Sequence, residues 1–235
     1  MTETIALVTG ANKGIGYETV KQLTALGMTT FLAARDVERG TVAAKELDAE
    51  FVQLDVTDPD SAKAAAAVVE DRYGRLDVLV NNAGIAGVAD QQPSTADVNV
   101  IRTVFDTNFF GVINVTNAML PLLSRSSAPR IVNVSSGIGS LAGMSSLHAA
   151  LPPSLAYVPS KTAVNSLTVQ YAKELRPQGI LVNAADPGYC ATDLNGHSGF
   201  RTTAQGAAVS VYLATLGADG PTGGFFTDDG AVVPW

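Results

Sequence analysis

Short apolar runs recur along the chain and alternate with longer segments in which apolar residues return every three or four positions. Runs of four or five residues that are apolar throughout are typical of strands buried on both faces, and the longer segments predict helices that cover them. The expected strands are residues 5–8, 30–33, 51–54, 76–80, 130–134, 180–182 and a last one near Phe225. The expected helices are residues 15–26, 37–47, 59–73, a long region from about 97 to 123, 157–175 and 203–216.

This alternation of strands and helices predicts an α/β fold built on a parallel sheet with helices on both faces. No internal repeat or linker interrupts the series, and 235 residues suit one domain with a sizeable core. We therefore expect residues 1–235 to form a single unit.

Composition narrows the classes of protein that fit this pattern. Hydrophobic residues make up 46% of the chain and charged residues 16%, which excludes a disordered chain. The net charge is −7 and no basic stripe exists, so a nucleic-acid partner is not expected. The single cysteine, Cys190, excludes an internal disulfide and a cysteine-based metal site. The first apolar stretch is too short for a signal peptide or membrane span, and we expect a soluble, cytoplasmic protein without membrane contact.

A glycine-rich turn follows the first predicted strand and opens the first predicted helix. Residues 9–16 read Thr-Gly-Ala-Asn-Lys-Gly-Ile-Gly. Glycines permit a tight turn and a close approach of backbone to phosphate, and the helix N-terminus offers free N–H groups and partial positive charge. Its place between a strand and a helix favours a dinucleotide site over a turn without a ligand.

Further motifs accompany this turn: Asn-Asn-Ala-Gly at 81–84, Tyr-Val-Pro-Ser-Lys at 157–161 and Pro-Gly at 187–188. Together with the Gly-x-x-x-Gly-x-Gly spacing, they make the whole chain resemble the short-chain dehydrogenase/reductase family. Residues 9–16, 34–36, 107–111, 133–136 and 223–235 resemble its carbonyl reductase branch. The resemblance implies a Rossmann-type, doubly wound sheet of about seven parallel strands, and a hydride-transferring ketone or aldehyde reductase.

The cofactor-binding residues combine the glycine turn with positions taken over from the family. They are Gly10, Asn12, Lys13, Gly14, Ile15, Gly16, Arg35, Asp55, Val56, Asn82, Ala83, Gly84, Tyr157, Lys161, Pro187, Gly188, Tyr189 and Thr192. The family implies that Asp55 and Val56 flank the adenine, although Asp55 could instead cap the helix that begins near Pro59. The family also implies that the loop containing Tyr189 and Thr192 binds the nicotinamide carboxamide, with Thr192 and the backbone near Tyr189 as the candidate contacts.

NADP(H) is the expected cofactor, with NAD(H) as second choice. Family alignment puts Ala34 where NAD-preferring members carry an acid, and the guanidinium of the next residue, Arg35, can pair with a 2′-phosphate. Lys13 adds a second positive charge, unless both are only solvated surface charges. Asp36 could bind an NAD ribose if the alignment slips by two residues.

Tyr157 and Lys161 are four residues apart, which places both on one face of a helix. The Lys161 ammonium, together with the positive nicotinamide ring of the oxidised cofactor, should favour phenolate and lower the pKa of Tyr157, and Lys161 could also hold the nicotinamide ribose. The resemblance implies that Ser136 holds the substrate oxygen and that Asn108 holds a water in a proton relay. Ser135 could merely form hydrogen bonds with backbone groups at the strand end, and Asn108 could merely bridge neighbouring strands.

Twenty residues, 137–156, separate Ser136 from Tyr157, where many family members have about a dozen. They should lie over the substrate, since loops on a rigid sheet commonly set specificity. The animal carbonyl reductases carry a longer insertion, thought to cover the face used for oligomerisation, so this intermediate length leaves homo-oligomer formation open. The expected apolar substrate pocket consists of Ser136, Ile138, Met144, Leu147, Tyr189 and Trp235, although Trp235 could equally be a terminal packing residue.

Other functions compete with this one. The same site could belong to an NADP(H)-sensing regulator without turnover, or to an NAD-dependent alcohol dehydrogenase. Epimerases and dehydratases of the extended family usually carry a larger C-terminal substrate domain, for which the residues after Pro187 are too few. No carboxylate or cysteine stands at ligand spacing from His148 or His197, so no metal is expected.

Overall fold

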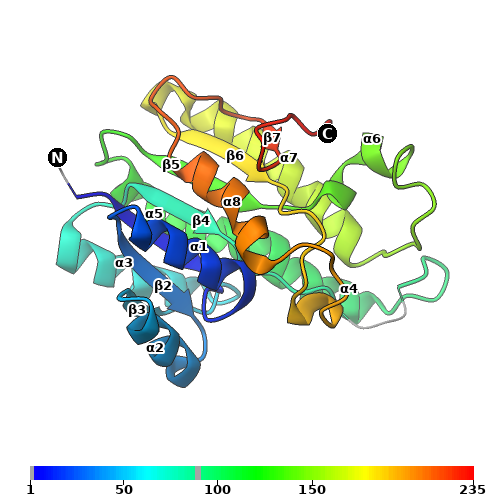
Figure 1. Ribbon diagram of the computed structural model, residues 1–235, viewed down its shortest axis with the longest axis horizontal. Helices are drawn as coiled ribbons and strands as arrows, with labels where there is room; N and C mark the ends of the chain where they lie inside the picture. The colour runs from blue at the N-terminus through cyan, green and yellow to red at the C-terminus, as the bar shows by residue number, and fades with distance from the viewer. Residues whose placement is uncertain (1–2, 88–90) are drawn as a thin grey trace.

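The computed structural model describes residues 3–87 and 91–235. In this part of the chain a single sheet of seven parallel strands has the order β3-β2-β1-β4-β5-β6-β7 (Figure 1), which confirms the expected Rossmann-type fold. The strands are β1 (Ile5–Thr9), β2 (Thr29–Ala34), β3 (Glu50–Gln53), β4 (Val78–Asn81), β5 (Arg130–Val134), β6 (Leu181–Ala185) and β7 (Phe225–Phe226).

The long helices begin and end close to the predicted positions. They are α1 (Gly14–Ala25), α2 (Val37–Glu46), α3 (Pro59–Tyr73), α4 (Val98–Phe105), α5 (Gly111–Leu123), α7 (Tyr157–Leu175) and α8 (Thr203–Ala214). Sequence patterns missed the short helix α6 (Leu141–Met144) and the 3-10 turns Gly137–Gly139, Arg176–Gln178 and Asp193–Asn195. Three or four residues are too few to show a helical period.

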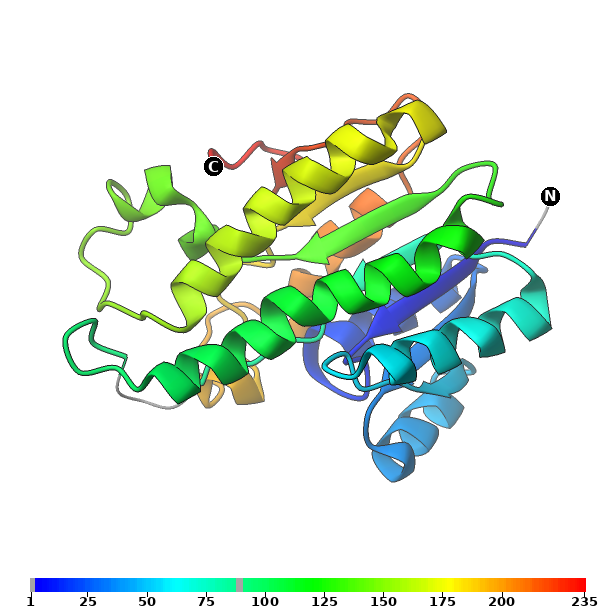
Figure 2. The same ribbon diagram turned by 180° about the vertical axis from the view of Figure 1, so that it is seen from behind.

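Alternate residues of each strand enter two separate apolar layers. Ile5 and Leu7 pack with α3, α5 and α7 on one face of the sheet, whereas Ala6 and Val8 pack with α1, α2 and α8 on the other. Figure 1 shows α1 and α8 in front of the sheet, and Figure 2 shows α5 and α7 covering its back. Burial on both faces explains why the strands read as unbroken apolar runs rather than as alternating ones.

The strand order reverses at β1, which pairs with β2 on one side and with β4 on the other. The connections after β1 and β4 therefore leave in opposite directions and open a crevice at the carboxyl ends of these strands. In the described part of the chain, no helix is both long and apolar enough to cross a membrane.

The long helix predicted over about 97–123 contains an interruption. One wider, π-helical turn, Asp106–Phe110, joins α4 to α5, and Figure 2 shows the three segments running on as one rod. The apolar period continues across this turn, so the sequence pattern does not reveal it. Such turns are frequent at functional sites, and this one contains Asn108.

Candidate active site

A cavity of about 1540 Å³ opens at the carboxyl ends of the strands. Its size exceeds the ~300–1,000 Å³ typical of a pocket for one small ligand, so it has room for a dinucleotide and a substrate together. Its lining includes all the predicted cofactor-binding residues except Gly16, and also Ser136. Segments far apart in the chain therefore meet here.

The glycine turn packs tightly against the end of β4. Gly10 has φ +61°, and a Cβ on it would lie 2.8 Å from the Cα of Ala83. A Cβ on Gly16 would lie 2.4 Å from the Asn82 amide nitrogen. Gly16 thus serves close packing beneath the turn, and it lies outside the cavity lining.

Thr9 and Asn82 connect the ends of β1 and β4. The Thr9 hydroxyl accepts hydrogen bonds from the backbone N–H groups of Asn82 and Ala83, at 2.9 and 3.0 Å. The Asn82 side-chain amide donates in return to the Thr9 and Gly10 carbonyls, at 2.8 and 3.2 Å. Asn82 therefore shapes the turn beside the cavity in addition to lining it.

The N-terminus of α1 suits an anionic group. Its N-cap residue, Lys13, makes no side-chain capping bond, and the first turn holds no acidic residue. The helices α2, α3, α4 and α8 instead have N-cap residues whose side chains accept backbone N–H bonds, namely Asp36, Asp58, Asp97 and Thr202. Because α1 points its first turn into the cavity, its partial positive charge can bind a pyrophosphate, so the residues fit a dinucleotide.

Arg35 follows β2 directly, and its exposed side chain contributes to the cavity lining. Asp36 turns away instead. It accepts the Arg39 N–H at 2.9 Å as the N-cap of α2 and forms an ion pair with the Arg39 guanidinium at 2.7 Å. This arrangement favours Arg35 as the group that meets a ribose phosphate, and Asp36 is not in position to hold a ribose.

Lys13 has a partner that the sequence did not reveal. Its ammonium pairs with the Asp193 carboxylate at 2.5 Å, and His197 Nε2 lies 2.9 Å from the other oxygen of that carboxylate. Hydrogen bonding from Lys13 holds the pKa of Asp193 below its usual range. The pair links the glycine turn to the segment after β6, and both partners line the cavity.

Asp55 and Val56 line the cavity at the end of β3, as expected. The Asp55 carboxylate accepts the N–H and the hydroxyl of Thr57, at 2.9 and 2.7 Å. The helix cap of α3 is Asp58, which accepts from the N–H of Asp60. The alternative that Asp55 caps this helix is therefore wrong.

Ser136 and Tyr157 face each other in the cavity wall. Tyr157 is the first residue of α7, Ser136 follows β5 by two residues, and their side chains form a hydrogen bond. Ser135 points into the core instead, where its hydroxyl hydrogen-bonds the Asn165 side chain at 2.6 Å. This geometry supports the choice of Ser136 over Ser135 as the residue available to a substrate.

Lys161 lies one turn further along α7. Its ammonium donates to the Val134 carbonyl at 2.8 Å and lies 5.7 Å from the centre of the Tyr157 ring. Burial alone lowers the pKa of Lys161 to about 8. The predicted pair is thus brought together on one helix face, with the ammonium over the ring.

Burial also raises the pKa of Tyr157 to about 12, against the expectation that a nearby ammonium would lower it. The hydrogen bond from Ser136 lowers this pKa, and the Asp186 carboxylate raises it further. The cost of removing a phenolate from water outweighs the effect of the neighbouring groups, so the protein's own residues do not lower this pKa. The expected lowering by an oxidised nicotinamide stays a prediction. The phenol keeps its proton at neutral pH.

Asn108 is buried behind the cavity wall rather than in its lining. Its amide nitrogen donates to the Ile85 carbonyl and to the Ser160 hydroxyl, both at 2.9 Å, and its oxygen accepts the Ile85 N–H at 2.9 Å. A Cβ on Gly84 would lie 3.4 Å from this oxygen and 3.6 Å from the Lys161 ammonium. The missing side chain of Gly84 therefore leaves space between the two polar groups.

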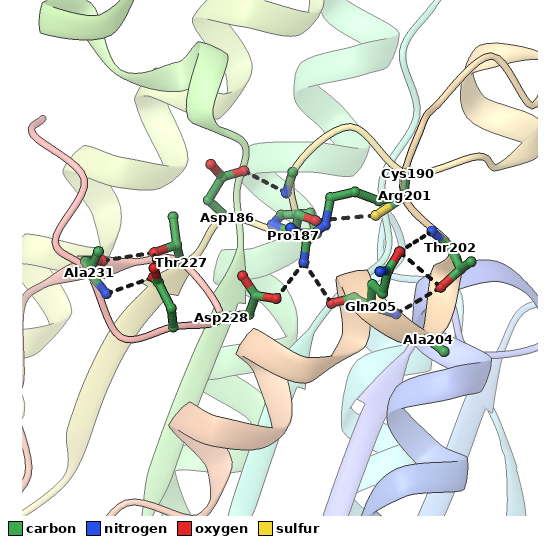
Figure 3. A network of polar contacts seen from close by, with 12 residues as sticks. Asp186, Pro187, Cys190, Arg201, Thr202, Ala204, Gln205, Thr227, Asp228 and Ala231 are labelled. Atoms are coloured by element: carbon green, nitrogen blue, oxygen red, sulfur yellow. Dashed lines mark hydrogen bonds and ion pairs between the residues drawn. The ribbon is translucent and has the colours of Figure 1, made fainter.

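The segment after β6 is held in place by Arg201 (Figure 3). Its guanidinium pairs with Asp228 and donates to the Gln205 carbonyl at 3.2 Å, while Asp186 accepts the N–H of Gly188 at 3.0 Å. Cys190 is buried in this network, and burial raises the pKa of its thiol. These contacts present Pro187, Gly188, Tyr189 and Thr192 to the cavity.

The predicted substrate residues divide into two groups. Ser136, Ile138 and Tyr189 line the cavity, whereas Met144, Leu147 and Trp235 lie outside its lining. Trp235 stacks on Phe225 with ring centres 5.6 Å apart, which supports the packing alternative. Leu147 is 83% exposed. From the segment 137–156, expected over the substrate, His148 and Leu151 also line the cavity. The wall further includes Ile85, Ala86 and Phe200, which sequence patterns did not indicate.

Both histidines line the cavity. In residues 3–87 and 91–235, no three His, Cys, Asp or Glu side chains gather in a group that could hold a metal ion. His148 lines the cavity near the substrate end, and His197 belongs to the Asp193 contact described above.

Comparison with known proteins agrees with this geometry. A family model described as short chain dehydrogenase matches residues 4–200. The chain is 37% identical to the short-chain dehydrogenase anuI of Penicillium roqueforti, over 97% of this chain and 95% of that protein. It is also 37% identical to carbonyl reductase (NADPH) 1 of Rattus norvegicus, over 98% of each.

A solved structure gives the same result. The NADPH-bound carbonyl reductase from chicken fatty liver superposes with a TM-score of 0.88 at 31% identity, and the match covers 100% of both chains. Motifs, strand order, cavity and relatives agree, and the chain belongs to the short-chain dehydrogenase family.

Proposed function

We propose that this protein is an NADP(H)-dependent carbonyl reductase, which reduces ketones or aldehydes in one catalytic unit formed by residues 1–235. The observation that carries the proposal is the placement of Ser136, Tyr157 and Lys161 in the same cavity as an uncapped helix N-terminus. The two carbonyl reductase relatives named above support the same activity and cofactor.

One part of the cavity would bind the cofactor, and the other would hold the substrate. The N-terminus of α1 would bind the pyrophosphate, and Arg35 with Lys13 would bind the ribose 2′-phosphate. Lys161 would hold the nicotinamide ribose through its ammonium. When bound, NADPH supplies the hydride that reduces the carbonyl carbon.

Tyr157 and Ser136 complete the reaction at the carbonyl oxygen. The Ser136 hydroxyl would donate a hydrogen bond to this oxygen and hold it against the phenol. Tyr157 would then transfer its proton to the oxygen, and a water between Asn108 and Lys161 would return a proton from solvent. The high pKa of Tyr157 suits this direction because the acid is fully protonated before the reaction.

The substrate end of the cavity favours apolar carbonyl compounds. Ile138, Leu151, Tyr189 and Phe200 contribute to its wall, and Phe200 is 84% exposed at the rim. The net charge of −7 argues against nucleic acid as a partner. We place the enzyme in the cytoplasm, acting on small molecules, and assign no oligomeric state.

The test combines turnover with binding. NADPH oxidation should be observed with a panel of ketones and aldehydes, and Tyr157→Phe should lower kcat by at least about a hundredfold while NADPH still binds. Binding of NADPH without turnover of any carbonyl compound would favour a cofactor-sensing regulator instead. Near-normal turnover in folded Tyr157→Phe would remove Tyr157 from its role.

A further inference from the structure

The helix that carries Tyr157 lacks a cap of its own. Residue Ala156 occupies the N-cap position of α7 and has no side chain that could accept a hydrogen bond, and the first turn contains no acidic residue. The first N–H groups of a helix have no partner within it and need one elsewhere. At α7 the uncapped end of the helix is also the position of the proposed proton donor.

Gln91 supplies the missing acceptor from another part of the chain. Its side-chain oxygen accepts hydrogen bonds from the Tyr157 N–H at 3.1 Å, the Ala156 N–H at 3.2 Å and the Ser154 hydroxyl at 2.6 Å. Its backbone carbonyl accepts the Leu155 N–H at 3.0 Å. One glutamine thus binds four consecutive residues at the start of α7.

The same side chain also holds the wall of the cavity. The Gln91 amide nitrogen donates to the Ala86 carbonyl at 2.8 Å, and Ala86 lines the cavity beside Ile85 and Gly87. The wall that contacts a substrate and the helix that donates the proton are therefore tied to one amide group.

The other side of Tyr157 is held independently of Gln91. The Ser160 hydroxyl donates to the Tyr157 carbonyl at 2.7 Å and accepts from Asn108 at 2.9 Å. Lys161 is anchored to the Val134 carbonyl at 2.8 Å, and its backbone packs on Gly139. Loss of the Gln91 contacts would consequently loosen the first turn of α7 and leave the second turn in place.

We propose that Gln91 is a positioning residue for the reaction. Its side-chain amide caps α7 from a distant segment of the same chain and fixes the Tyr157 hydroxyl relative to the cavity wall. The inference rests on the proposed role of Tyr157 as proton donor. It assigns to Gln91 an effect on the chemical step, with no part in holding the cofactor.

The first experiment compares a variant that loses the cap of α7 with one that loses the cap of α3. Gln91→Met keeps the side-chain length and removes the acceptor, and we expect kcat for carbonyl reduction to fall roughly ten- to a hundredfold, the cost of a small misplacement. The Kd of NADPH should change less than about twofold, because Lys161 and the glycine turn keep their contacts. Asp58→Ala removes the cap of α3, outside the cavity lining, and should lower the melting temperature with kcat within about twofold of the unchanged enzyme.

A rescue variant and a double mutant sharpen the result. Gln91→Glu keeps an acceptor at the helix N-terminus but loses the donor to the Ala86 carbonyl, so it should recover part of the lost kcat. In a Tyr157→Phe background, Gln91→Met should slow the residual rate less than about twofold, because the group that it positions has been removed.

Four outcomes would overturn the proposal: a kcat for Gln91→Met no lower than that of Asp58→Ala, a parallel loss of NADPH affinity, a Gln91→Glu variant as slow as Gln91→Met, or losses that multiply in the double mutant. Near-normal turnover in Tyr157→Phe alone would instead refute the proposed role of Tyr157. A slow Tyr157→Phe beside a fast Gln91→Met would refute only the role of Gln91.

Discussion

Tyr157 must carry its proton to act as an acid, and burial in the cavity wall keeps that proton in place. Its pKa of about 12 lies far above neutral pH, so the phenol does not limit reduction under ordinary conditions. Lys161 responds to the same burial in the opposite sense, with a pKa lowered to about 8. Desolvation disfavours the charged form of each, so it raises the pKa of the phenol and lowers that of the ammonium.

This difference predicts how cofactor binding depends on pH. The Lys161 ammonium is charged below pH 8 and loses its proton as the pH rises through about 8, while Tyr157 stays protonated. We expect the Kd of NADPH, measured by fluorescence titration, to increase through this range because a positive hydrogen-bond donor to the ribose is lost. Lys161→Ala should bind more weakly and without this step.

A matched control for this titration is Lys13→Ala, which removes a different ammonium from the same cavity. It should weaken binding and keep the step near pH 8. A step that persists unchanged in Lys161→Ala would assign it to another group.

At the scale of single elements, we expect the end of β2 to select between NADP(H) and NAD(H). Ala34 ends the strand, Arg35 reaches the cavity, and Asp36 begins α2. The sequence left two alignments open, one with Arg35 at the 2′-phosphate and one with Asp36 at the ribose, because it does not show where these side chains point. The helix cap at Asp36 distinguishes them, since a carboxylate that caps α2 and pairs with Arg39 is not free for a ribose.

We therefore expect NADPH to be preferred over NADH, and Ala34→Asp with Arg35→Ser to reverse the preference. The new carboxylate would repel a 2′-phosphate and accept hydrogen bonds from the ribose hydroxyls. The change should appear mainly in the KM of the cofactor, because the ribose lies far from the reacting carbon. The ratio of kcat/KM with NADPH and NADH is the measurement.

Asp36→Asn tests the alternative alignment in the same assay. The asparagine oxygen can still cap α2, so the fold is kept and only the charge is removed. The NADPH preference should not change. A large change in NADH use would show that Asp36 contacts the ribose after all.

The helices and strands were predictable to within a few residues because burial on both faces leaves a strong apolar pattern. The π-helical turn at Asp106–Phe110 was not, since it interrupts the helix without interrupting the apolar sequence. The contacts of Gln91 with α7 were equally hidden. They join residues more than 60 positions apart, and a glutamine in a loop gives no local signal of the helix that it caps.

At the scale of the whole molecule, every group assigned to binding or chemistry stands at one edge of the sheet. The family motifs predicted this gathering, because the carboxyl ends of parallel strands meet at one edge. Tertiary contacts such as Lys13 with Asp193, and the position of Trp235 on Phe225, depend on how loops fold over that edge. The position of residues 137–156 between Ser136 and Tyr157 predicted that they lie over the substrate, yet it could not tell which of them face the cavity.

Several glycines beside the cavity have much less room around them than two glycines at the opposite edge of the sheet. On the cavity side, a Cβ on Gly10, Gly137 or Gly188 would lie within 2.8 Å of a neighbouring atom. At the opposite edge, a Cβ on Gly74 or Gly217 would have nothing within 4 Å. The turns at Gly74 and Gly217 therefore have room for added residues. A five-residue Gly/Ser insertion after Gly217 should keep kcat within about twofold, whereas the same insertion after Gly188 should abolish turnover, as a steady-state assay would show. A protein of this design can acquire a tag, a fluorophore or a fused domain at one edge while its chemistry continues undisturbed at the other.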